Sequence, residues 1–115
     1  MGRRELKFKS DKFKSARGGW SRWLLISCEK CKSPAVLYQK DGPGILKRLY
    51  VDRIIAPETY GKSLVCSKCR VILGIQTTYQ KENRLVYRLF VGAVVKKTVP
   101  QVKLAKALTV IESGA

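Results

Sequence analysis

Short apolar segments bounded by polar or turn-forming residues recur along the chain after position 20. Residues 23–26 lead into one cysteine pair and residues 35–38 leave it, while Leu64 and Val65 lead into a second pair. Residues 71–79 follow that second pair and are rich in β-branched and aromatic residues, which favours a strand. The pattern therefore predicts a small β-rich fold in which each cysteine pair lies between strands.

Two further segments extend this prediction toward the C-terminus. Residues 81–83 form a polar turn between residues 71–79 and 85–95, so the two apolar segments are predicted to pair as a hairpin. Gly92 lies inside the second segment and is expected to mark a bulge. Beyond Pro100, residues 102–111 fit either a final strand or a frayed helix.

The segment between the cysteine pairs is ambiguous. Residues 41–44 read Asp-Gly-Pro-Gly, which is a strong turn signal, and residues 45–55 follow. Ile45, Leu49 and Val51 would share one face of a strand, but residues 46, 49, 50 and 54 also have helical spacing. The sequence leaves this element open between strand and helix.

The four cysteines form two Cys-x-x-Cys motifs, and the chain contains no histidine. Four thiolates complete a tetrahedral zinc site, and a two-residue gap lets one tight turn aim both sulfurs at the same point. A redox dithiol or an iron–sulfur cluster is an alternative, although a single motif near a βαβ unit is the usual redox pattern. We predict one structural Zn²⁺ bound by the following residues: Cys28, Cys31, Cys66 and Cys69.

Cations flank both motifs. Lys30 and Lys32 lie beside the first pair, and Lys68 and Arg70 lie beside the second, while Glu29 opposes them locally. Nearby positive charge favours the thiolate over the thiol, so this pattern supports metal binding.

The paired motifs with intervening β structure resemble the zinc ribbon superfamily, whose members include ribosomal proteins, transcription factors and RNA-polymerase subunits. The resemblance covers residues 28–69 and implies a small β-rich zinc ribbon, built from antiparallel hairpins around a four-cysteine zinc site. Two features depart from the family pattern. The 34 residues between Cys31 and Cys66 exceed the usual spacing of about 15–20. Lys32 and Arg70 also stand where many members have glycine after the second cysteine.

Positive charge dominates the chain. It has 24 Lys and Arg against 8 Asp and Glu, a formal charge of +16, whereas small domains usually carry roughly 2–8. Residues 1–19 hold many of these cations and end in a Gly-Gly hinge, which predicts a flexible basic arm before a zinc-ribbon domain at 20–115. Such an excess of charge favours nucleic acid as a partner. The expected contacts are Arg3, Arg4, Lys7, Lys9, Lys12, Lys14, Arg17, Arg22, Lys47, Arg48, Arg53, Arg84, Arg88, Lys96 and Lys97.

RNA is the expected partner ahead of DNA. The sequence shows no helix-turn-helix or continuous basic helix to enter a major groove, and a zinc-stapled β domain with a basic arm is similar to small ribosomal proteins. Aromatic residues among the charges could stack on unpaired bases. Most of these rings, including Trp23, Tyr87 and Phe90, are nevertheless expected in the core, and Trp20 fits either role. The alternatives are a protein-docking zinc ribbon and a DNA-binding one of the transcription type.

The sequence does not predict an enzyme. It lacks histidine for acid–base chemistry, a paired-carboxylate motif and the Lys-Ser/Thr of a phosphate-binding loop after Gly44. No apolar segment approaches the ~18 residues of a membrane span, and the N-terminus lacks the apolar region of a secretory signal. A cytoplasmic protein without a membrane partner is therefore expected, in which paired cysteines stay reduced.

Overall fold

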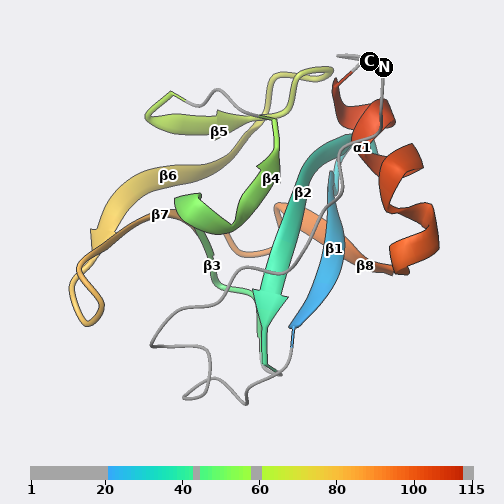
Figure 1. The fold of residues 1–115 in the computed structure, drawn as a ribbon. Helices are drawn as coiled ribbons and strands as arrows, with labels where there is room; N and C mark the ends of the chain where they lie inside the picture. The colour runs from blue at the N-terminus through green and yellow to red at the C-terminus, as the bar shows by residue number, and fades with distance from the viewer. Residues whose placement is uncertain (1–20, 43–44, 58–60, 113–115) are drawn as a thin grey trace.

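A computed structural model describes residues 21–42, 45–57 and 61–112. Over these residues the chain forms two four-stranded sheets, and every strand pair is antiparallel. In Figure 1 the first sheet and the C-terminal helix lie to the right, and strands of the second sheet lie to the left. The β-rich prediction is confirmed, whereas the predicted basic arm and Trp20 lie outside the described residues.

The first sheet has the strand order β4–β2–β1–β8. Its central hairpin is formed by β1 and β2, which pair from Ser21 opposite Asp41 to Ile26 opposite Val36. The bounds of its strands are β1 (Ser21–Cys28), β2 (Pro34–Asp41), β4 (Ile54–Ala56) and β8 (Val94–Val99).

The second sheet has the strand order β3–β7–β6–β5. The predicted hairpin after the second cysteine pair is present as β6 and β7, with Tyr79 opposite Arg84 next to the turn. The bounds of its strands are β3 (Arg48–Tyr50), β5 (Ser63–Val65), β6 (Ile72–Tyr79) and β7 (Arg84–Leu89).

The ambiguous middle segment is neither one strand nor one helix. It contributes β3 to the second sheet, makes a single 3-10 turn over Val51–Arg53, and then contributes β4 to the first sheet. The predicted face shared by Ile45, Leu49 and Val51 is not formed. Ile45 precedes β3 and is 78% exposed, whereas Leu49 is fully buried.

The predicted single strand over residues 85–95 is wrong, because a turn divides it. The β7 strand ends at Leu89, and the Ala93 N–H donates to the Phe90 carbonyl (3.1 Å) before β8 begins. Gly92 has a φ of 75° and lies in this turn instead of a bulge. The left-handed backbone that glycine adopts freely lets the chain leave the second sheet and join the first.

Two apolar clusters lie on opposite faces of the first sheet. One contains Leu24, Ile26 and Tyr38 together with Leu49 and Tyr87 of the second sheet, so it lies between the sheets. The other lies on the far face and packs against the C-terminal helix. Its buried members are Trp23, Leu37, Ala56, Val99, Leu104 and Leu108.

The C-terminal segment is a helix, which resolves the choice left by the sequence. After Pro100, a 3-10 turn at Gln101–Lys103 leads into α1 (Leu104–Glu112). The Trp23 indole N–H donates to the Gln101 Oε1 (2.8 Å), so the buried indole has a polar partner where this segment begins. This bond and the apolar contacts of Leu104 and Leu108 fix α1 against the first sheet.

A buried ion pair lies at one end of the first sheet. The Arg53 Nε lies 3.4 Å from the Asp41 Oδ2, and both side chains are 5% exposed or less. Ser21 and Gln39 donate to the Asp41 Oδ1 at 2.7 and 2.9 Å. Burial acts to raise the pKa of Asp41, but these hydrogen bonds and the Arg53 charge outweigh it, so the pKa lies below its ordinary value.

Candidate metal centre and basic face

Each cysteine pair forms the turn of a hairpin, one in each sheet. The first turn joins β1 to β2, and the second joins β5 to β6. In the first, the Cys28 N–H donates to the Ser33 carbonyl (2.9 Å) and the Lys32 N–H donates to the Cys28 carbonyl (2.8 Å). The second repeats both bonds, from Cys66 to Val71 (2.9 Å) and from Arg70 to Cys66 (3.0 Å). The two cysteine turns therefore have the same backbone structure.

The residue after each second cysteine has a left-handed backbone. Lys32 has a φ of 64° and Arg70 a φ of 67°. A glycine would take this conformation without steric cost, whereas other residues are disfavoured there by about 1–2 kcal/mol. The absence of glycine from these positions therefore leaves the turn geometry intact and places a cation beside each pair.

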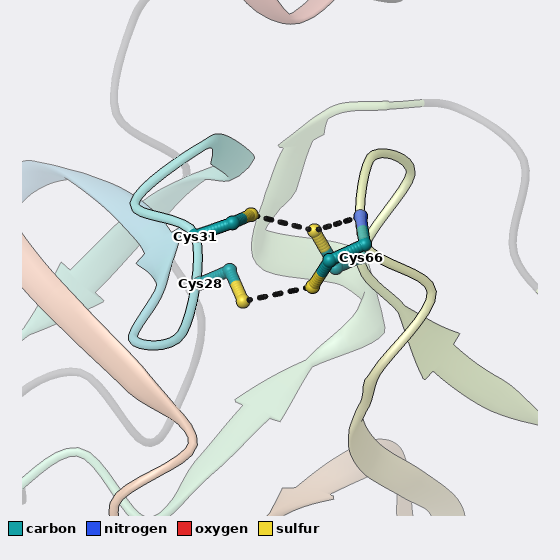
Figure 2. Close-up of side chains that lie close together, drawn as sticks. Cys28, Cys31 and Cys66 are labelled. Atoms are coloured by element: carbon teal, nitrogen blue, oxygen red, sulfur yellow. Dashed lines mark hydrogen bonds between the residues drawn. The ribbon is translucent and has the colours of Figure 1, made fainter.

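The four sulfurs converge on one point. Figure 2 shows Cys28 and Cys31 on one turn facing Cys66 on the other. The Cys28 and Cys69 sulfurs lie 3.6 Å apart, the Cys31 and Cys66 sulfurs lie 3.5 Å apart, and all four lie within 4.8 Å of one another. A disulfide bond would need about 2.05 Å. The cysteines are free thiols arranged as a possible metal-binding cluster.

The spacing of the sulfurs fits one metal ion. In a tetrahedral site with zinc–sulfur bonds of about 2.3 Å, sulfurs lie about 3.8 Å apart. An iron–sulfur cluster would hold its cysteines further apart, because several irons and bridging sulfides lie between them. The first cysteine of each pair is buried and the second is half-buried, so the cluster reaches from the interior to the surface.

Hydrogen bonds and burial shift the pKa values of the two half-buried thiols, Cys31 and Cys69. The side chain and backbone of Ser33 hydrogen-bond to Cys31 and lower its pKa to about 6, so this thiol ionises near neutral pH. The Val71 backbone acts in the same direction on Cys69. Burial and the hydrogen bonds from the other three cysteines outweigh it and raise the pKa of Cys69 to about 11. Ser33 and Val71 were not predicted, although both stand two residues after a second cysteine.

The cations predicted around the cluster are all exposed. Lys32 pairs with Glu29 across the first turn (2.9 Å), so part of its charge is balanced locally. Lys30, Lys68 and Arg70 also lie at the surface, around the two turns. An exposed ion pair contributes little to stability, so these residues act mainly on the charge of the cluster.

Several predicted nucleic-acid contacts lie together on the outer face of the second sheet. Arg48 of β3 is opposite Arg88 of β7, which is opposite Ile75 of β6. The neighbouring register row, Leu49 opposite Tyr87, is buried between the sheets. Because side chains alternate along a strand, Arg48 and Arg88 point away from the core. Two tyrosines and a third arginine lie on the same face by this alternation: Tyr50, Tyr79 and Arg84.

On this face two arginines flank a pair of tyrosines. The Arg48 guanidinium lies 4.0 Å from the centre of the Tyr79 ring, and Arg84 lies 4.0 Å from that of Tyr50. The two tyrosine rings meet edge to face with centres 6.2 Å apart. Such contacts hold the long arginine side chains in place over the sheet. We call Arg48, Tyr50, Tyr79, Arg84 and Arg88 the basic face.

The other predicted contacts are scattered, and one arginine of the basic face is itself paired with acidic residues. Arg53 is buried beside Asp41, and Arg84 pairs with Asp52 (2.6 Å) and Glu82 (2.9 Å), so neither offers an unbalanced charge at the surface. Lys47 is exposed just before β3. Arg22 is half-buried and donates to the Gly42 carbonyl (3.0 Å). Lys96 and Lys97 are exposed on β8, and the predicted contacts in residues 1–19 lie outside the described residues.

The aromatic residues divide between core and surface. Trp23 is 2% exposed and Tyr87 is fully buried, as predicted. Phe90 is 47% exposed, so its predicted place in the core is wrong. The turn after β7 explains the difference, because Phe90 follows the last residue of the strand and belongs to neither apolar cluster.

Fold and site together define a small two-sheet β protein with four cysteines clustered between its sheets, close enough to hold one metal ion. Comparison with known protein families, curated proteins and solved structures finds no match for this chain. In the part of the chain that the structure describes, no helix is long and apolar enough to cross a membrane.

Proposed function

We propose that this chain is a zinc-ribbon-type protein that uses one structural Zn²⁺ to support an RNA-binding surface. The observation that carries the RNA-binding part is the basic face, where three strands of one sheet present arginines and tyrosines together. Cations neutralise phosphates, and aromatic rings in the same surface can stack on bases. The formal charge of +16 supports a polyanionic partner.

Zinc is the proposed metal because the ligand set is four thiolates at tetrahedral spacing. Cys28, Cys31, Cys66 and Cys69 would complete the coordination sphere, which is the arrangement of structural rather than catalytic zinc. When bound, the ion would stabilise the fold by joining the two hairpins. A binding protein fits this site better than an enzyme, because no coordination position would remain for a substrate.

RNA is proposed ahead of DNA, in a ribosomal or ribosome-associated setting. The one α-helix that the structure describes, α1, carries a single lysine and packs Leu104 and Leu108 against the first sheet. It therefore lacks the basic exposed face with which a recognition helix enters the DNA major groove. A sheet surface with arginine and tyrosine is better suited to RNA with unpaired bases.

The proposal is tested by metal analysis and a binding series. Native mass spectrometry should show one Zn²⁺ per chain. Fluorescence anisotropy should then compare structured RNA, single-stranded RNA and duplex DNA of equal length across a salt series. We expect RNA to bind at least tenfold tighter than DNA at ~150 mM salt, about 1.4 kcal/mol. Equal binding of all three, fading together with salt, would contradict RNA recognition.

A matched pair of charge substitutions tests whether the basic face is the surface that binds RNA. Arg88→Ala removes an exposed cation of the basic face, and Lys106→Ala removes an exposed cation from α1, beyond the first sheet. Both lower the net charge by one. If the basic face binds RNA, Arg88→Ala should weaken binding and reduce the salt slope by about one, while Lys106→Ala changes both less. Equal effects would mean that only total charge matters.

A protein-docking zinc ribbon is the second candidate, favoured by exposed apolar residues on β5 and β6. Val65, Ile72 and Ile75 are 39–44% exposed, and β5 is an edge strand. Exposed apolar residues at a sheet edge are typical of protein contacts. In this case binding should resist salt, and a pull-down after nuclease treatment should recover one dominant protein that Ile72→Asp releases.

A further inference from the structure

A groove runs over the outer face of the second sheet and extends past the basic face. It has a volume of about 820 Å³ and is lined by β6, β7, residues 45–48 and the turn that follows β7. Arg48, Tyr79 and Arg88 of the basic face line it, and so does Phe90. The groove therefore joins part of the basic face to Phe90, the aromatic residue that was expected in the core but is exposed.

The charged side chains among the described residues that line the groove are all positive. Its lining includes Lys47, Arg48, Lys81 and Arg88, and no Asp or Glu is among the described residues that line it. Within the described part of the chain, Lys47, Lys81 and Arg88 form no ion pair. Their charge is available to a ligand, and an extended polyanion is the complementary occupant.

Phe90 is held in place while its ring remains accessible. Its N–H donates to the Leu73 carbonyl (3.0 Å), and its carbonyl accepts from the Ala93 N–H (3.1 Å). The adjoining Leu89 N–H donates to the Lys47 carbonyl (3.1 Å), which ties the end of β7 to the segment before β3, where Lys47 also lines the groove. An aromatic ring on an anchored backbone can stack on a base with little loss of conformational freedom.

We propose that this groove holds an unpaired stretch of RNA, with phosphates on its cations and a base stacked on Phe90. This inference rests on the proposed RNA-binding function and specifies the form of RNA that is bound. In a duplex each base is already stacked and paired, so its faces are closed to a side chain. Only a loop, bulge or single strand offers a free base together with a flexible backbone that can follow the cations.

The test uses Phe90→Ala in the zinc-loaded full chain, with Phe90→Trp as the rescue variant. The probes are a single-stranded oligouridylate and an RNA duplex with the same number of phosphates, measured by fluorescence anisotropy. Loss of one stacked base corresponds to about a 5- to 150-fold weaker affinity. We expect that loss for Phe90→Ala on the single strand, a change below about twofold on the duplex, and near wild-type binding by Phe90→Trp.

The possible failures are distinguishable. If the wild-type protein binds neither RNA at ~150 mM salt, the proposed function fails and this inference fails with it. If it binds RNA but Phe90→Ala leaves single-strand affinity unchanged, or weakens both RNAs equally, the groove proposal alone is overturned. Polyglutamate that competes as well as oligouridylate would also overturn it, because the groove would then suit an acidic protein. Val102→Ala, at an 89% exposed position before α1, is the control for surface truncation.

Discussion

The two sheets of this protein have similar size but different surroundings. The first is covered on both faces, by the second sheet on one and by α1 on the other. The second is covered on its inner face, and its outer face presents arginines and tyrosines around a groove. A sheet buried on both faces forms the stable framework, while a sheet with one open face can hold charged side chains ready for a ligand. The cysteine cluster links the two, because each sheet supplies one turn.

The largest loss of stability should come from disrupting the cysteine cluster that links the two sheets. Cys66→Ser, or Cys28→Ser, removes a proposed zinc ligand, and structural zinc contributes about 10–16 kcal/mol in small modules. That exceeds or matches the total stability of a typical domain, about 5–15 kcal/mol. We expect either variant, or the wild type with a strong chelator, to lose cooperative thermal unfolding followed by circular dichroism.

Ser67→Ala is the control, because Ser67 is an exposed residue of the same turn and is not a ligand. It should unfold like the wild type. A Cys66→Ser protein with native spectra and cooperative unfolding would show that the cluster is not a structural metal site.

Truncating one side chain in each sheet should distinguish the buried first sheet from the exposed outer face of the second sheet by the cost in stability. Leu37 is fully buried in the first sheet, so Leu37→Ala should lower the free energy of unfolding by about 2–5 kcal/mol. Ile75 is 40% exposed on the second sheet, and Ile75→Ala should cost less than about 1 kcal/mol. Urea unfolding in excess zinc measures both values. Equal losses would show that the outer face of the second sheet is also part of a core.

The buried ion pair of the first sheet predicts how the stability of one variant compares with that of the wild type as pH changes. Asp41→Asn leaves Arg53 buried without its charge partner, which should destabilise the protein by about 3–5 kcal/mol at pH 7. Because the folded pKa of Asp41 is lowered, its contribution is full above the unfolded pKa and is lost as pH falls through the folded pKa.

Denaturant unfolding of wild type and Asp41→Asn in excess zinc, at pH 7 and pH 5, tests the lowered pKa. The difference in unfolding free energy between the two proteins should be the same at both pH values, because the folded pKa of Asp41 lies below this range. A difference that shrinks between pH 7 and pH 5 would mean that the pKa of Asp41 is not lowered by folding.

The smallest expected change in stability comes from a substitution in the cysteine turn of the second sheet. Arg70→Gly relieves a left-handed backbone, but glycine also adds about 0.5–1 kcal/mol of conformational freedom to the unfolded chain. We expect a net stabilisation of less than about 1 kcal/mol. Lys68→Gly removes the same charge from this turn without a positive φ, and it should destabilise. Thermal unfolding that ranks Lys68→Gly above Arg70→Gly would contradict the strain argument.

Local patterns predicted the pieces that depend on neighbours in sequence. The Cys-x-x-Cys spacing indicated two turns that each direct two sulfurs at one point, and the β-branched and aromatic residues in 71–79 indicated a strand. The hydropathy pattern failed where one apolar segment contributes a strand to each of the two sheets. Residues 89–95 contain no charged or polar side chain, so nothing in their hydropathy separates β7 from β8 or marks Phe90 as exposed. The buried pair of Asp41 and Arg53 was also invisible, because its members come from different elements.

The sequence by itself determined that four thiolates can bind one metal, that the chain is β-rich, and that its charge suits a polyanion. These properties follow from residue type and short-range spacing. Tertiary structure decided which cations share a surface and which are neutralised, because that depends on strand pairing between distant segments. Arg48 and Arg88 are 40 positions apart and become neighbours only through the pairing of β3 with β7. Arg53, close to Arg48 in sequence, is buried in the 3-10 turn, and its charge is balanced by Asp41.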